Sequence, residues 1–230
     1  MNLSIVDLSL IEYKKALDIQ YILHKKRQQN EIQDVLLLLE HKAVLTLGTR
    51  GDVNNIYLPK EKLKEQGIEI FEVNRGGDVT YHGPGQIVGY LIMDLKSMDN
   101  DLKAFVKKME DGIIAYLRNE QGINALHQEG KYTGVWLGEK KIAAIGIEAK
   151  KWVTMHGFAF NINTNLEHFK LINPCGLSKE VTSLEEQIGY KEDISKVKSA
   201  LALCICQEYN RTPVFKKIEE LICEKDYECL

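Results

Sequence analysis

The sequence predicts an α+β (α/β) fold in which a mixed, largely antiparallel sheet is flanked by helices. Apolar residues recur at helical spacing near both ends of the chain and in its middle, and the segments between them are short and β-rich. Between residues 123 and 163 the apolar period changes to two, which is typical of an antiparallel meander. No repeat, low-complexity tract or linker interrupts the 230 residues, so we expect a single domain over residues 1–230.

The individual elements follow from the same patterns. In the first expected helix, apolar residues from Leu10 to Leu23 recur at spacings of three and four, and Asp7 or Ser9 would cap its start. The expected helices are residues 7–29, 60–66, 102–118, 194–209 and 214–224. The expected strands are two tightly joined segments, 35–40 and 43–48, then 68–73 and 87–95, and the meander strands 132–137, 141–147 and 153–162.

Bulk composition excludes several classes of protein. The formal charge of −3 gives no global basic field, so nucleic acid is not an expected partner. No run of about 18 apolar residues appears, and the first residues lack the charged and apolar regions of an export signal. We therefore expect a soluble cytoplasmic protein without a membrane partner.

The five cysteines are not arranged as a disulfide framework or a metal site. They have no paired CxxC spacing and no histidines at zinc-finger distances, and no HxxxH or HExxH motif occurs, so we expect no metal. Cys204 and Cys206 lie in an apolar run and are expected to be structural, and Cys223 and Cys229 lie in a charged tail. That leaves Cys175, in the turn Asn-Pro-Cys-Gly.

The stretch from Arg75 to Tyr90 is unusually rich in glycine. It carries Arg75, His82 and Gln86 among five glycines, between two apolar runs, and glycine lets a backbone approach a ligand closely. A binding wall and a long hairpin connection explain this composition equally well. Arg50, after the strand 43–48, could face the same cleft, although a solvated loop arginine is the commoner case.

A thiol reacts as the thiolate, so a nucleophilic Cys175 needs a neighbouring cation or base. The candidates are Lys141, His82 and His156. Strict alternation predicts Lys141 on the same face as Ala143 and Ile145, where a charge is unusual unless it points into a cleft, but a strand-end lysine reaching solvent is the more frequent case. For His156, an auxiliary role beside a ligand and a hydrogen-bonded structural role remain equally open.

The string Arg-Gly-Gly-Asp-Val-Thr-Tyr-His-Gly-Pro-Gly-Gln at residues 75–86 resembles the signature of the lipoyl(octanoyl) transferase family. Three further parts of the chain are similar to that family: residues 46–51, the segment 141–146, and His156 to Ala159 running on to residues 173–176. The resemblance covers roughly residues 40–189, whereas both ends match only in helical character. It implies an acyltransferase of lipoate biosynthesis and a fold like the catalytic domains of biotin and lipoate protein ligases.

The resemblance also implies roles for individual residues. Cys175 would be the nucleophile that accepts the acyl group, Lys141 would lower its pKa, and His156 would be an auxiliary residue. His82 would shape the site instead of serving as its base. The substrate-binding residues would be Arg75, Gly76, Gly77, Asp78, Val79, Thr80, Tyr81, His82, Ala144, Ile145, Gly146, Gly157, Phe158 and Ala159. No cofactor or metal is implied.

The expected partners follow from the same resemblance. Octanoyl-acyl carrier protein would be the donor, and a lipoyl domain of a 2-oxoacid dehydrogenase or the glycine cleavage H protein would be the acceptor. Exchange of one thioester for another on Cys175 is nearly isoenergetic and needs no ATP. The alternatives are an ATP-dependent lipoate or biotin protein ligase, an amidotransferase that moves octanoyl between protein lysines, and a catalytically silent acyl-binding module.

Overall fold

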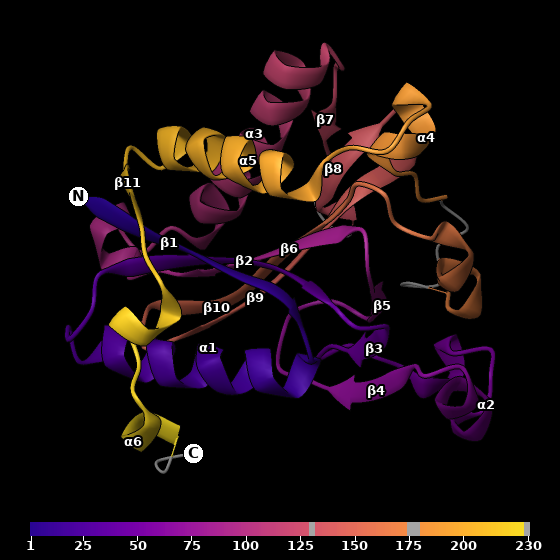
Figure 1. The fold of residues 1–230 in the computed structure, drawn as a ribbon, viewed down its shortest axis with the longest axis horizontal. Coiled ribbons are helices and arrows are strands. Elements are labelled where there is room, and N and C mark those ends of the chain that lie inside the picture. The colour runs from indigo at the N-terminus through magenta and orange to yellow at the C-terminus, as the bar shows by residue number, and fades with distance from the viewer. Residues whose placement is uncertain (129–131, 174–179, 228–230) are drawn as a thin grey trace.

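The computed structural model describes residues 1–128, 132–173 and 180–227, and an eight-stranded sheet with helices on both faces organises it (Figure 1). Strand β1 pairs in parallel with β2 and β11, and the other neighbours pair antiparallel. The predicted mixed, largely antiparallel sheet is confirmed. The strand order is β11 (Thr212–Phe215), β1 (Asn2–Ile11), β2 (Asp34–His41), β6 (Gln86–Ile92), β10 (Val153–Asn161), β9 (Lys140–Lys150), β8 (Gly134–Leu137) and β7 (Leu126–His127).

Helices cover the two faces because the central strands are apolar on both. In β2, Leu36 and Leu38 pack toward α3 (Leu102–Gln121) and α5 (Ile194–Glu208), whereas Leu37 and Leu39 pack toward α1 (Tyr13–Gln28). Figure 1 shows α3 and α5 on one side of the sheet and α1 on the other. The short helices are α4 (Leu184–Ile188) and α6 (Glu224–Tyr227). Within the described ranges, no helix is long and apolar enough to cross a membrane.

A second, three-stranded sheet lies beside the first, and the sequence did not predict it. Its order is β4 (Glu69–Glu72), β3 (Val44–Leu47), β5 (Val79–His82), with α2 (Lys60–Glu65) packed nearby. The predicted strands 35–40 and 43–48 therefore belong to different sheets and do not pair. Strand β5 lies inside the glycine-rich stretch, and β4 is an edge strand with both glutamates exposed. Hence the expected loop between two buried strands is in part a strand itself.

The predicted helix over residues 7–29 is wrong at its start. Residues Asn2–Ile11 form β1, and the helix begins at Tyr13 without a side-chain cap. Leu3 and Ile5 pack on the α3 face and Val6 on the α1 face, so this segment gains hydrogen bonds and burial as a strand. Ser9 has a positive φ of 55° where the pairing with β2 shifts register. Tertiary pairing overrides the local helical pattern.

The predicted helix over residues 214–224 is also wrong. Thr212–Phe215 form β11, a 3-10 turn follows at Ile218–Glu220, and α6 begins only at Glu224. The backbone of this segment bonds to the edge strand β1: Thr212 N donates to Met1 O at 3.0 Å and Lys216 N donates to Ile5 O at 2.9 Å. The free backbone N–H and C=O groups of the edge strand β1 thus pair with residues 212–216 and hold them in an extended conformation. The other predicted helices, 60–66, 102–118 and 194–209, are confirmed.

The predicted meander is confirmed, but a bulge changes which side chains share a face. Val135 lies opposite Ala143, whereas the next residue, Trp136, lies opposite Lys141. Consequently Ala143 packs into the core, and Lys141 lines a cavity. The predicted common face of Lys141, Ala143 and Ile145 is therefore wrong for Ala143, because the bulge breaks the period of two, whereas Ile145 lines the cavity with Lys141.

Candidate active site

A cavity of about 260 Å³ lies among the glycine-rich stretch, the beginnings of β8 and β9, and α3. Its walls combine apolar side chains from Val106, Ile145, Phe169 and Val181 with a few polar groups. A largely apolar cavity with few, convergent polar groups is typical of a small-ligand site. The charged residues that line it are Arg50, Arg75, Asp78 and Lys141.

Arg75 braces the backbone of this site. Its side chain is 8% exposed, and Nη2 donates to Thr46 O at 2.7 Å, to Thr46 Oγ1 at 2.8 Å and to Asp78 O at 2.7 Å. Nε donates to Thr46 Oγ1 at 3.1 Å and Nη1 to Gly76 O at 3.1 Å. Most of the guanidinium N–H donors thus bond to backbone carbonyls, whose positions the planar group fixes. The residue holds β3 and the glycine-rich stretch at a fixed separation.

Two glycines are required by the geometry of this wall. Gly77 has a φ of +97°, which L side chains rarely adopt. At Gly146 in β9, an added Cβ would lie 2.8 Å from Gly76 O and 3.2 Å from the side chain of Arg75. Gly76 N donates to Ile147 O at 3.0 Å, so the glycine-rich stretch lies directly against β9. Close approach of the two backbones therefore depends on the missing side chains.

Lys141 lies at the β8 side of the cavity. Its Nζ donates to Thr133 O at 3.1 Å and lies 4.9 Å from the centroid of the Trp136 ring, within cation–π range. Its backbone is also held: Lys141 N donates to Glu180 O at 2.9 Å and Thr182 N donates to Lys141 O at 3.0 Å. A cation fixed in a largely apolar cavity can stabilise a thiolate or move a proton at a reacting amine.

A buried carboxylate that was not among the predicted site residues, Glu110, holds the Thr133–Gly134 peptide, whose carbonyl accepts a hydrogen bond from Lys141. Glu110 in α3 is 5% exposed, and its Oε1 accepts a hydrogen bond from Gly134 N at 2.7 Å, one residue after Thr133. Burial raises the pKa of Glu110. The signal was present, because Glu110 lies one helical turn from both Val106 and Ile114 in an apolar pattern. Glu110 thus positions the peptide that holds Lys141.

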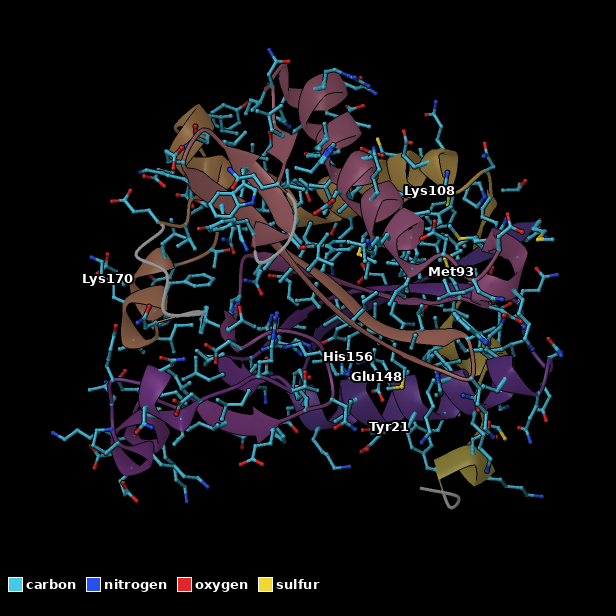
Figure 2. The ribbon with its side chains drawn as sticks, turned by 180° about the vertical axis from the view of Figure 1, so that it is seen from behind. Tyr21, Met93, Lys108, Glu148, His156 and Lys170 are labelled. Carbon is cyan, nitrogen blue, oxygen red and sulfur yellow. The ribbon has the colours of Figure 1, made fainter. Side chains whose placement is uncertain are left out.

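The cavity continues into a smaller inner cavity of about 50 Å³. The two share the lining residues Arg75, Thr80, Ala144, Ile145, Gly146 and Ala159. Tyr13, His82, Tyr90 and His156 line the inner cavity and not the outer one. Figure 2 shows His156 inside the molecule, between the large sheet and α1, and its N–H donates to Gln20 Oε1 of α1 at 2.9 Å. Aromatic and imidazole side chains thus line the inner cavity, whereas Lys141 lines only the outer one.

Two buried, neutral histidines, His82 and His156, line the inner cavity, and a third, His41, packs behind them against His82 and Tyr90. Burial lowers the pKa of His41 and of His156 to about 4 each, and it lowers the pKa of His82 well below its ordinary value. His82 Nδ1 bonds to Gln86 Oε1 at 2.8 Å, and His41 Nε2 bonds to Tyr90 Oη at 2.7 Å. These bonds fix the orientation of His82 in the cavity wall and of His41 behind it.

The structure brings most of the predicted site residues together. Residues 75–80 and Lys141 line the outer cavity, Ala144–Gly146 and Ala159 line both cavities, and His82, His156, Gly157 and Phe158 line the inner one. Tyr81 is the exception: it packs in the core of the small sheet, with its hydroxyl 2.7 Å from His168 Nδ1. Arg50 does share the cleft of Arg75. Cys175 lies outside the described residues.

Comparison with known proteins identifies the family. The Lipoyl protein ligase A/B catalytic domain matches residues 12–205. An octanoyltransferase of Caldicellulosiruptor saccharolyticus is 55% identical over 198 residues, covering 86% of this chain and 84% of the relative. The chain belongs to the octanoyltransferase family. A second member of that family, from Desulforamulus reducens, is 48% identical over 226 residues, covering 96% of this chain and 99% of the relative.

Membership in the octanoyltransferase family makes this chain an acyltransferase. The fold agrees: the crystal structure of lipoate-protein ligase A bound with ATP superimposes with a TM-score of 0.81 at 18% identity, covering 99% of this chain and 92% of that one. The expected likeness to lipoate protein ligases is therefore confirmed for the fold. An identity of 18% establishes the shared fold alone.

Among the cysteines in the described ranges, none lines the outer or the inner cavity. Cys206 is buried in α5, as expected, and burial raises its pKa to about 11. Cys204 is only half-buried, but burial raises its pKa too. Cys223 is exposed and lies in the C-terminal segment beyond β11. A thiol with a raised pKa forms less thiolate at neutral pH.

Acid is expected to destabilise this octanoyltransferase-family fold through His41 and His156. Each binds a proton at about pH 4 in the folded chain but near its ordinary pKa of 6.5 when unfolded. Their neutral forms therefore contribute stability that is present above pH 6.5 and is lost as the pH falls toward 4, about 3 kcal/mol for each histidine. Urea unfolding at pH 7.5, 6 and 5 measures this slope.

Two variants test whether His156 contributes to the pH dependence of the free energy of unfolding. His156 has a positive φ of 62°, which asparagine also tolerates, so His156→Asn is the suitable replacement. It should flatten the pH dependence of the free energy of unfolding, whereas His127→Gln, at an exposed position, should leave it unchanged. An unaltered slope in His156→Asn would contradict the assignment.

Proposed function

We propose that this chain transfers an octanoyl group from acyl carrier protein to a lysine of a lipoyl domain, through a thioester on Cys175, and so supplies the precursor of protein-bound lipoate. The observation that carries the proposal is Lys141, a cation held in the wall of a largely apolar cavity. The relatives named octanoyltransferase support the acyl group. The acceptor would be a lipoyl domain of a 2-oxoacid dehydrogenase or the glycine cleavage H protein.

The reaction has two balanced steps. The Cys175 thiolate attacks the carbonyl carbon of the donor thioester, a new thioester forms, and the carrier's thiolate leaves and takes up a proton. The acceptor lysine, as the neutral amine, then attacks the Cys175 thioester, an amide forms, and the cysteine thiolate is released. Lys141, as a cation, would stabilise the Cys175 thiolate in the first step and donate its proton to the carrier's leaving thiolate. The neutral lysine would then accept the amine's proton in the second step and return to the cation.

The described residues on both sides of Cys175 support its assignment. Asn173 N donates to Asn55 O at 2.8 Å, and on the other side Glu180 and Thr182 bond to the backbone of Lys141. Val181, between these two, lines the cavity. The Asn55 side chain in turn donates to Asp78 Oδ2 at 2.6 Å, which links Asn173 to the same cavity wall.

An acceptor assay separates this proposal from an ATP-dependent ligase. A lipoyl domain is incubated with the protein and either octanoyl-acyl carrier protein alone or free octanoate with ATP and Mg²⁺, and its intact mass is measured. One octanoyl group should be added from the carrier protein and none from the free acid. Modification only with ATP would contradict the transferase proposal and support an ATP-dependent ligase. No modification from either donor would support a catalytically silent acyl-binding module.

A further inference from the structure

One side chain, Tyr13, separates the inner cavity from a groove on the outside of the molecule. Tyr13 is the first residue of α1 and is 3% exposed. It lines the inner cavity, and it also lines a groove of about 250 Å³ whose other walls include Lys42, Val44 and Lys64. Among the described residues, no other side chain is common to these two linings.

The Tyr13 ring is fixed in this wall by its neighbours. Its centroid lies 5.0 Å from that of His41 and 5.1 Å from that of Phe71, and it stacks on His82 at 6.3 Å with an interplanar angle of 12°. It belongs to a buried cluster with Leu17, Val44 and Met155. A ring packed on several sides is a rigid end wall, because rotation would require these contacts to be broken.

The two cavities form a path from Lys141 to this wall. Along β9, Lys141 and Gly146 are five residues apart, roughly 16 Å at the rise of an extended strand. With carbon–carbon bonds of about 1.5 Å, an extended eight-carbon chain is about 9 Å long. An octanoyl group that starts beside Lys141 therefore ends near Ala144, where the cavities overlap. A longer chain must enter the inner cavity, and a chain of about 16 carbons, about 19 Å when extended, must meet the wall.

We infer that Tyr13 sets the upper limit on the length of the acyl chain. The inference rests on the proposed octanoyl transfer. Its aromatic ring stops the methyl end of a chain that has filled the inner cavity, and removing the ring joins the inner cavity to the outer groove. Val44 and the aliphatic stem of Lys64 offer apolar surface in that groove for the additional methylenes.

The test compares octanoyl- and hexadecanoyl-acyl carrier protein as donors to the protein, with kcat/KM for each. In Tyr13→Ala the ratio of hexadecanoyl to octanoyl transfer should rise at least 10-fold over wild type, because one methylene in an apolar pocket changes kcat/KM by about 10-fold or more. Tyr13→Phe keeps the ring and should keep the wild-type ratio. Leu17→Ala removes a buried side chain of the same cluster that lines neither cavity, and it should also keep the ratio.

The outcomes are separable. A wild-type protein that loads neither donor refutes the proposed transfer itself. A wild-type protein that transfers octanoyl, with a Tyr13→Ala ratio within 2-fold of wild type, overturns the inference about Tyr13 alone, and so does an equal rise in Leu17→Ala. If Tyr13→Ala does not fold, Tyr13→Leu shortens the same wall with a smaller loss of packing, and the same ratio decides the question.

Discussion

Replacing Cys175 with alanine is expected to abolish octanoyl transfer. Incubation of the wild-type protein with octanoyl-acyl carrier protein should add one octanoyl group to the chain, and hydroxylamine should remove it, as it does from a thioester. In Cys175→Ala the nucleophile is absent and the added mass should not appear. Intact mass spectrometry before and after hydroxylamine treatment measures both results.

The matched control for this experiment is Cys223→Ala, which removes an exposed thiol in the C-terminal segment. It should load octanoyl at the wild-type rate. A stable octanoyl adduct on Cys175→Ala, or an adduct that resists hydroxylamine, would show that another group accepts the acyl chain. Loss of loading in the Cys223 variant would point to the same conclusion.

Removing Lys141 should have the next largest effect. Lys141→Ala takes away the cation held by Thr133 O and beside the Trp136 ring, so the Cys175 thiol should need a higher pH to react. The octanoyl-transfer rate should fall about 100- to 10,000-fold, the usual contribution of a positioned proton-transfer group. The pH dependence of Cys175 alkylation by iodoacetamide, followed by peptide mass spectrometry, measures the first effect.

A second variant distinguishes the two roles of Lys141. Lys141→Arg keeps a permanent cation but removes the group that can become neutral, so the alkylation profile should stay near wild type while transfer to the acceptor lysine is lost. Lys140→Ala is the neighbouring control, since that side chain reaches out to Glu180 and Glu186. An alkylation profile that is the same in Lys141→Ala and wild type would remove Lys141 from the proposed mechanism.

Part of the fold was predictable because certain segments carry their own periodicity. The helix α3 follows from an apolar spacing of three to four that its buried residues repeat, and the strands β8, β9 and β10 follow from an alternation in the sequence, although all of β10 is buried. Residues Asn2–Ile11 and Thr212–Phe215 were misread because each becomes a strand only by pairing with the other and, for β1, with β2. A pairing between opposite ends of a chain leaves little local signal.

By itself, the sequence determined which family this chain belongs to and which segments form its cavity. Residues 75–86 are a local string, and such a string can be recognised without knowing the fold. The tertiary structure decided what each side chain does there. A bulge between Val135 and Trp136 sets Lys141 in the cavity, Arg75 is turned onto backbone carbonyls, and Tyr81 is turned into the core of the second sheet.

Tyr13 and Glu110 show most clearly that contacts between separate elements cannot be predicted from sequence spacing. They are separated from the recognised string in sequence, and only the packing of α1 and α3 on the sheet brings them to the inner cavity and to the Thr133–Gly134 peptide. Sequence spacing fixes neighbours along one helix or strand. Contacts between elements depend on how those elements pack, so the end wall of the cavity and the support of its lysine were visible only in the folded chain.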